Sequence, residues 1–144
     1  MQELVVPRPV SRDDNCLCYV RKLLGSNVYD PALPLNPFGG TVYVGSGDGK
    51  VYALDAVTGT ERWTHTTGDA VDSSPAVVGG TVYVGSNDHM LYALDAVTGT
   101  ERWTYATGGA VRSSPAVVGG TVYVGSNDST VFALDAASGA GPAD

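Results

Sequence analysis

Apolar and polar residues alternate in short runs from residue 39 to the end of the chain. Within one stretch these runs are SSPAVV (73–78), TVYVGS (81–86), LYALDA (91–96) and ERWTYAT (101–107), and tight turns separate them. Runs of this length, rich in Val, Tyr and Thr and bounded by Gly, Asn and Asp, are typical of β-strands joined as hairpins. The pattern therefore predicts four strands in an antiparallel meander.

Both faces of this meander are apolar. In the 81–86 run, Val82 and Val84 point to one side and Tyr83 points to the other, and the 91–96 run is apolar on both sides as well. A sheet with two apolar faces must be covered on both of them. A small antiparallel sheet covered on both faces by copies of itself is a propeller blade.

The chain supplies such copies. Residues 39–78 and 79–118 differ at eight of 40 positions, and a third copy (119–144) ends before its fourth strand. The first copy lacks its own SSPAVV, for which ALPLNPF (32–38) is the candidate. Propellers close with about four to eight blades, so we expect residues 39–144 to form part of one. Its open edges would pair with further blades, a protein partner or another copy of the chain.

The twelve residues ALDAVTGTERWT stand at 53–64 and again at 93–104. Asp55 can accept N–H bonds from the turn that follows it, and Gly59 supplies the positive φ that such turns commonly require. The turn leads to Trp63 on the outermost strand, where the indole ring can lie across the next blade. We therefore expect each tryptophan to fasten one blade to its neighbour.

The spacing Ala-x-Asp-x-x-Thr-Gly-x-x-x-Trp resembles the tryptophan-docking motif of the PQQ-like β-propeller repeat family. The matching residues are Ala53, Asp55, Thr58, Gly59 and Trp63, then Ala93, Asp95, Thr98, Gly99 and Trp103, and in the third copy Ala133, Asp135 and Gly139 without a tryptophan. This resemblance implies an all-β fold, a partial β-propeller of about three four-stranded antiparallel blades.

Residues 1–38 form a separate segment of unassigned role. DDNCLCYVRKLLG (13–25) predicts a short helix, and a Pro-rich linker follows it. Cys16 and Cys18 are expected to be free structural thiols, because two sulfurs cannot close a zinc site. A cysteine nucleophile is the alternative, but no histidine is placed beside it by spacing.

The charge balance narrows the classes of partner. The 144 residues include 15 acidic and 8 basic side chains, a net charge of −7, which disfavours nucleic-acid binding. No stretch is long enough for a membrane span, and the N-terminus lacks the apolar region of a signal peptide. The chain as written is expected to be cytoplasmic, although similar repeat proteins are often exported or associated with the cell envelope.

Seven of the eight differences between the first two copies fall on the turn between the second and third strands, or on the end of the fourth strand and the loop after it, which lie at one end of the predicted blades. A varied loop face on a rigid scaffold is a common place for binding, and drift on solvated loops is the alternative. The polar candidates on this face are Asp48, Lys50, Asp69, Asp72, His89 and Arg112. The aspartates of the SxD turns, Asp48, Asp88 and Asp128, are explained by hairpin turns without calcium, which needs six or more oxygens.

Three functions remain open. The first is a non-catalytic PQQ-like repeat segment that acts as a protein-interaction scaffold, without cofactor, metal or catalytic residue. The second is a fragment of a quinoprotein dehydrogenase. The resemblance implies that such an enzyme holds pyrroloquinoline quinone (PQQ) and calcium in a full ring with an adjacent Cys-Cys pair, whereas here Leu17 separates the cysteines. The third is a truncated product without a function of its own.

Overall fold

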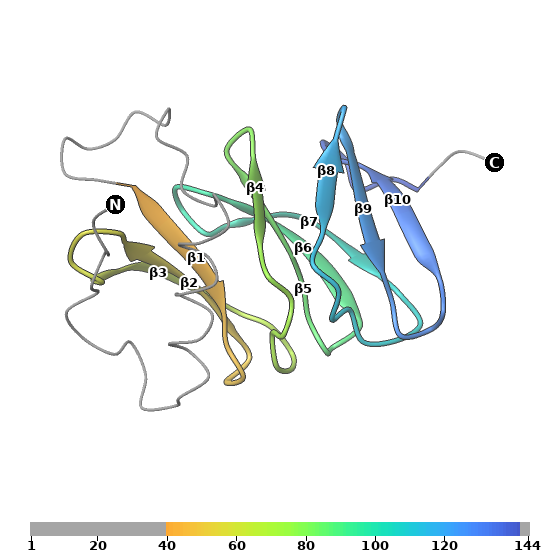
Figure 1. Cartoon of the computed structure of the whole chain (residues 1–144), viewed down its shortest axis with the longest axis horizontal. Helices are drawn as coiled ribbons and strands as arrows, with labels where there is room; N and C mark the ends of the chain where they lie inside the picture. The colour runs from red at the N-terminus through yellow and green to blue at the C-terminus, as the bar shows by residue number, and fades with distance from the viewer. Residues whose placement is uncertain (1–39, 142–144) are drawn as a thin grey trace, which may run out of the picture.

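The computed structural model describes residues 40–141, and this part of the chain is all-β. Its sheets stand side by side along the long axis of the molecule (Figure 1). The strands are β1 (Thr41–Gly45), β2 (Lys50–Asp55), β3 (Glu61–Thr66), β4 (Ala76–Val78), β5 (Thr81–Gly85), β6 (Met90–Asp95), β7 (Glu101–Ala106), β8 (Ala116–Val118), β9 (Thr121–Gly125) and β10 (Val131–Asp135). Over the described residues, no helix has the length and hydropathy needed to cross a bilayer.

Each sheet is an antiparallel meander in which neighbours in sequence are neighbours in space. The strand orders are β1-β2-β3, β4-β5-β6-β7 and β8-β9-β10, and we call these sheets the first, second and third blade. The second blade holds all four strands that one repeat predicts, and within residues 40–141 the third blade contains β8, β9 and β10. This confirms the expected partial propeller. The predicted helix at 13–25 and the candidate first strand at 32–38 lie outside the described residues.

In the second and third blades the first strand is shorter than the sequence pattern predicts. β4 begins at Ala76 instead of Ser73, because Pro75 has no N–H to donate to a ladder. Ser73 instead links its own blade to the next: its Oγ accepts from the amide of Gly85 on β5 at 3.0 Å and donates to the carbonyl of Ser113, before β8, at 2.9 Å. The residues before β4 therefore connect blades.

Two of the three buried apolar clusters lie between blades. The third, formed by Val42, Val44, Leu54 and Ala56, lies on the face of the first blade that points away from the second. Val82 and Val84 of the second blade are fully buried and face the first blade. Tyr83 and Leu91, on the opposite face of the same sheet, are buried against the third blade. Both faces of the middle sheet are thus covered by its neighbours, as the alternation of apolar residues predicts.

Candidate functional site

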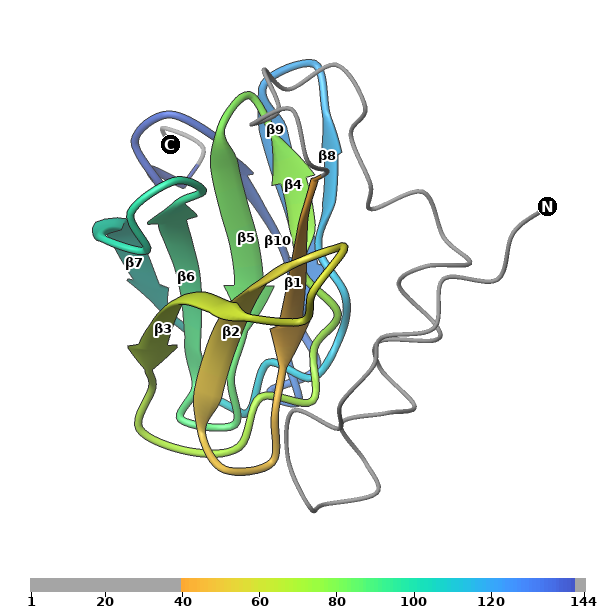
Figure 2. The same ribbon diagram turned by 90° about the vertical axis from the view of Figure 1, so that its left-hand side faces the viewer.

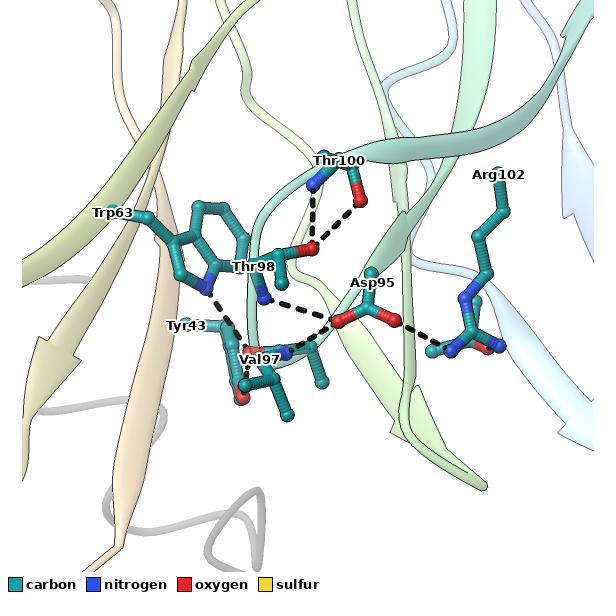
Figure 3. A network of polar contacts seen from close by, with 9 residues as sticks. Tyr43, Trp63, Asp95, Val97, Thr98, Thr100 and Arg102 are labelled. Atoms are coloured by element: carbon teal, nitrogen blue, oxygen red, sulfur yellow. Dashed lines mark hydrogen bonds and ion pairs between the residues drawn. The ribbon is translucent and has the colours of Figure 1, made fainter.

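The contact that recurs between blades is a tryptophan donating to the turn of the next blade (Figure 3). Nε1 of Trp63, on β3, donates to the carbonyl of Ala96 at 3.0 Å. The hydroxyl of Tyr43, on β1, donates to the same oxygen at 2.8 Å, so both lone pairs of that carbonyl are engaged. Trp103 and Tyr83 repeat the arrangement on Ala136, with both distances 3.0 Å.

The face of each indole ring lies on a glycine. Gly99 has φ of 73°, a conformation that side chains disfavour, and a Cβ built there would lie 2.5 Å from Cδ2 of Trp63. Gly139 has φ of 70° and would place a Cβ 2.5 Å from Cε3 of Trp103. Glycine is therefore required twice over, by the backbone of the turn and by the close approach of the ring.

An aspartate holds this turn in shape. Oδ1 of Asp95 accepts the amides of Val97 at 2.9 Å and Thr98 at 3.0 Å, which is the expected Asx turn. Oδ2 of Asp95 pairs with Nη2 of Arg102 at 2.7 Å. The guanidinium and the turn amides together lower the pKa of Asp95 to about 2.

The first blade repeats this arrangement. Arg62 pairs with Asp55 at 2.6 Å, and the pKa of Asp55 is likewise lowered to about 2, first by the hydrogen bond from this arginine and then by the turn amides.

The arginine is a functional residue that the sequence analysis did not single out. Its position comes from a bulge: Trp103 lies opposite Ala93 and Glu101 lies opposite Leu94, so that Arg102 is the extra residue of β7. The same register shift places Arg62 in the first blade. The signal was present in the sequence, because Arg immediately precedes the tryptophan in both copies.

The third copy of the motif forms the acceptor half of this contact. Oδ1 of Asp135 accepts the amides of Ala137 at 3.0 Å and Ser138 at 2.8 Å. Gly139 and the carbonyl of Ala136 receive Trp103 as described above. Among residues 40–141, however, no arginine pairs with Asp135 and no tryptophan follows it.

The candidate binding residues all lie at one end of the blades, where the β1–β2 and β5–β6 hairpins and the β3–β4 connection gather (Figure 2). Asp48 and Lys50 belong to the first hairpin, Asp69 and Asp72 to the β3–β4 connection, His89 to the β5–β6 hairpin and Arg112 to the β7–β8 connection. His89 adopts the positive φ of 76° that such a hairpin requires at this position.

Of these six residues, Asp48 accepts the amide of Lys50 within one hairpin, and Asp72 and Arg112 are joined across two different connections. Nδ2 of Asn87 donates to Asp72 at 2.9 Å, and its Oδ1 accepts from Nε of Arg112 at 3.1 Å. Arg112 also lies 3.8 Å from Asp72. Asn87 was not among the predicted residues, although it too differs between the first two copies. The loop face thus contains one polar network that spans two inter-blade connections.

Two of the three SxD aspartates, Asp88 and Asp128, bind between blades as well as within their hairpins. Oδ2 of Asp88 accepts the amide of Gly68, which belongs to the preceding blade's outgoing loop, at 2.8 Å. Asp128 accepts the amide of Gly108 in the same way, also at 2.8 Å. Asp48 binds its own hairpin only, within the described residues. Hairpin turns therefore account for the contacts of Asp48, but for only some of the contacts of Asp88 and Asp128.

The described residues do not gather the ligands of a metal site. Nowhere in residues 40–141 do three His, Cys, Asp or Glu side chains come together. Asp48, Asp88 and Asp128 stand in three different blades, and their oxygens accept backbone amides. Cys16 and Cys18 lie outside the described residues.

This fold and its docking contact define the class of the protein: it is a propeller repeat protein. The sequence model for "Outer membrane protein assembly factor BamB", a PQQ-like repeat family, matches residues 30–141. The chain therefore belongs to the PQQ-like β-propeller repeat family. No curated protein sequence matches it.

Solved structures share the fold. BamB from Moraxella catarrhalis is 31% identical with a TM-score of 0.63, and the match covers 74% of this chain and 33% of that one. The quinohemoprotein alcohol dehydrogenase ADHIIG from Pseudomonas putida HK5 is 31% identical with a TM-score of 0.64, covering 70% and 18%. The computationally designed Ika8 protein is 22% identical with a TM-score of 0.63, covering 70% and 32%. The chain thus spans a third or less of these proteins.

We expect Trp103→Ala to lower the free energy of unfolding by about 3–5 kcal/mol, because it removes a large side chain packed between two blades and its hydrogen bond. Chemical denaturation followed by circular dichroism measures the change. Val97→Ala is the matched control, since that side chain is 84% exposed and its loss should cost less than about 0.5 kcal/mol. Equal stability of the two variants would contradict the docking role of the indole.

A second comparison isolates one inter-blade hydrogen bond. Asp88→Ala and Asp48→Ala remove the same hairpin contacts, but only Asp88 also accepts the amide of Gly68. Asp88→Ala should therefore be less stable than Asp48→Ala by about 1 kcal/mol in urea unfolding. Identical midpoints and slopes for the two variants would show that the bond contributes nothing.

The depressed pKa of Asp95 predicts a dependence of stability on acid. Because the pKa of this carboxyl is about 2 in the folded chain and 3.8 for an unperturbed aspartate, its contribution is complete above about pH 4 and is lost as the pH falls toward 2. The contribution should stay below about 1 kcal/mol, because the ion pair is partly exposed. Asp95→Asn should flatten this part of the curve of thermal midpoint against pH, whereas Glu61→Gln, at an exposed position, should leave the curve unchanged.

Proposed function

We propose that the chain is a non-catalytic PQQ-like repeat segment that serves as a protein-interaction scaffold within a larger propeller. The observation that carries this proposal is the outer face of the third blade. Tyr123 is 44% exposed and Val131 is 76% exposed, whereas their counterparts Tyr83 and Leu91 are 4% and 0% exposed. The third blade therefore presents a face that is buried wherever another blade follows it.

The related proteins are much longer than the described blades, which supports a place for these blades within a larger propeller. The described blades correspond to 33% of BamB from Moraxella catarrhalis, a protein of the family named for outer membrane protein assembly. An assembly factor acts by binding other proteins, so its name favours an interaction role for this chain.

A fragment of a quinoprotein dehydrogenase is the alternative, favoured by the likeness to the Pseudomonas enzyme. If bound, PQQ and calcium would supply the oxidising group and its Lewis acid. The described residues do not fit them: three potential metal ligands never meet in residues 40–141, and both tryptophans are committed to docking. These observations favour the scaffold.

Titration of the purified chain with PQQ and calcium tests the two functions against each other. The scaffold predicts no saturable change in the quinone absorbance and no reduction of an electron-accepting dye when an alcohol is added. Saturable binding together with dye reduction would overturn the proposal.

Sedimentation of the same sample addresses the third function. A scaffold segment should sediment as a discrete monomer or oligomer, because its inter-blade core is formed within the chain. Progressive aggregation would instead indicate a truncated product without a function of its own.

A further inference from the structure

We propose that a groove between the second and third blades binds a small molecule that carries a carboxylate on a short apolar body, and that the guanidinium of Arg102 receives the carboxylate. The groove has a volume of about 380 Å³, at the lower end of the range of about 300–1,000 Å³ that small-molecule sites occupy. This site is additional to the proposed scaffold function, because its walls are two blades that are already packed together.

The groove opens at the end of the blades where the β4–β5 and β8–β9 turns stand side by side, away from the varied loops (Figure 1 and Figure 2). Its walls are apolar: the second blade contributes Val78 and Tyr83, and the third contributes Val117 and Ala136. The ring of Tyr83 is buried, and its hydroxyl donates to the carbonyl of Ala136, which joins the two walls. The groove therefore exists because these two blades dock on each other.

Among the described residues that line the groove, Arg102 is the one with a charged side chain. Two contacts hold its guanidinium: Nη2 pairs with Asp95 at 2.7 Å, and Nη1 donates to Oγ1 of the buried Thr81 at 2.9 Å. Arg62, the equivalent residue of the first blade, makes the aspartate contact but no hydrogen bond to a threonine within residues 40–141. Arg102 is thus positioned before a ligand arrives, which lowers the entropic cost of binding.

The guanidinium of Arg102 keeps donors for a ligand. A guanidinium has five N–H groups, and the contacts with Asp95 and Thr81 use two of them. The side chain of Arg102 is 45% exposed and lines the groove, so its remaining N–H groups are open to a ligand there.

A carboxylate on a short apolar body matches this lining. Arginine binds a carboxylate through charge-assisted hydrogen bonds, which are about twice as strong as those between neutral groups. An alkyl chain gains free energy by leaving water for the valine, alanine and tyrosine side chains of the walls. A neutral alcohol lacks the charge, and an amine would be repelled by the guanidinium. The ligand class is therefore a small aliphatic acid.

Sodium hexanoate, titrated into the isotope-labelled full chain and followed by NMR, is the probe for this site. We expect saturable shifts of the amides of Thr81, Val117 and Ala137, with a dissociation constant of roughly 1–10 mM, because a ligand with so few non-hydrogen atoms reaches only modest affinity. Hexanol and hexylamine carry the same alkyl chain and should bind at least about tenfold more weakly.

Variants of the chain locate the site. Arg102→Gln should weaken hexanoate binding at least about tenfold, because it removes the charge. Ala137→Asp should weaken it by a similar factor, because it adds a negative charge to the lining; the equivalent turns carry Val57 and Val97, so this position accepts a larger side chain. Arg112→Gln removes the same charge at the opposite end of the blades and should bind hexanoate as the unchanged chain does.

Absence of saturable binding would overturn the proposal, and so would equal affinity for hexanol or shifts confined to another part of the chain. Unchanged binding by Arg102→Gln would also overturn it. If that variant fails to fold, the hexanol comparison and Ala137→Asp still decide the outcome.

A tripeptide that ends in leucine presents the same chemistry from a second source, the carboxyl end of a protein. Tighter binding of this tripeptide than of hexanoate would overturn the small-molecule assignment, and weaker binding would support it. None of these results bears on the scaffold function, which the titration with PQQ and calcium tests separately.

Discussion

The structure depends on one contact, an indole N–H that donates to a carbonyl in the turn of the next blade. Each blade is apolar on both faces, so none can bury its surface alone, and stability has to come from neighbours. The Trp63–Ala96 and Trp103–Ala136 bonds fix the distance and angle at which neighbours meet. Gly99 and Gly139 allow that approach, because any side chain there would occupy the space of the ring.

The contact is directional. In the first and second blades, one side carries the tryptophan and the tyrosine, and the opposite side of the second and third blades presents the turn carbonyl and its glycine. The second blade uses both sides, giving its turn to Trp63 and inserting Trp103 into the third. A stack of this kind grows in one direction and leaves unlike surfaces at its two ends, which is why an unfilled end of such a stack invites a specific partner.

The regular parts of this architecture follow from local patterns in the sequence. Period-two alternation on both strand faces and a repeat every 40 residues were sufficient to predict the strands, their antiparallel order and burial between blades. The role of Arg102 was not predicted from the sequence, because it depends on a bulge that alternation alone does not reveal.

The hydrogen bond from the amide of Gly68 to Asp88 was not predicted either, for a different reason. It joins a loop to a hairpin 20 residues further on, and neither residue carries a local signal of the other. Contacts that depend on how two blades are offset can be found only once the blades are placed.

On the loop face, a difference between the repeats creates a favourable contact between neighbouring blades. Asp72 and Arg112 occupy equivalent positions in successive repeats, and Asn87 links them. Identical repeats would set like charges at these positions, and like charges in proximity destabilise a structure. The substitution of aspartate by arginine in the second copy replaces that repulsion with attraction, so part of the variation on this face is explained by blade packing without a ligand.

Contact with the second blade explains some of the residues of the third blade and leaves others unexplained. Gly139 and the carbonyl of Ala136 are needed to receive Trp103, and Asp135 is needed to hold their turn. Their presence is therefore explained by the contact with the second blade. Tyr123 does not take part in that contact, and its ring lies on the opposite face of the sheet, 44% exposed. A large aromatic surface left in water has no structural role within residues 40–141, and for that reason Tyr123 is the more informative residue in any search for what this chain binds.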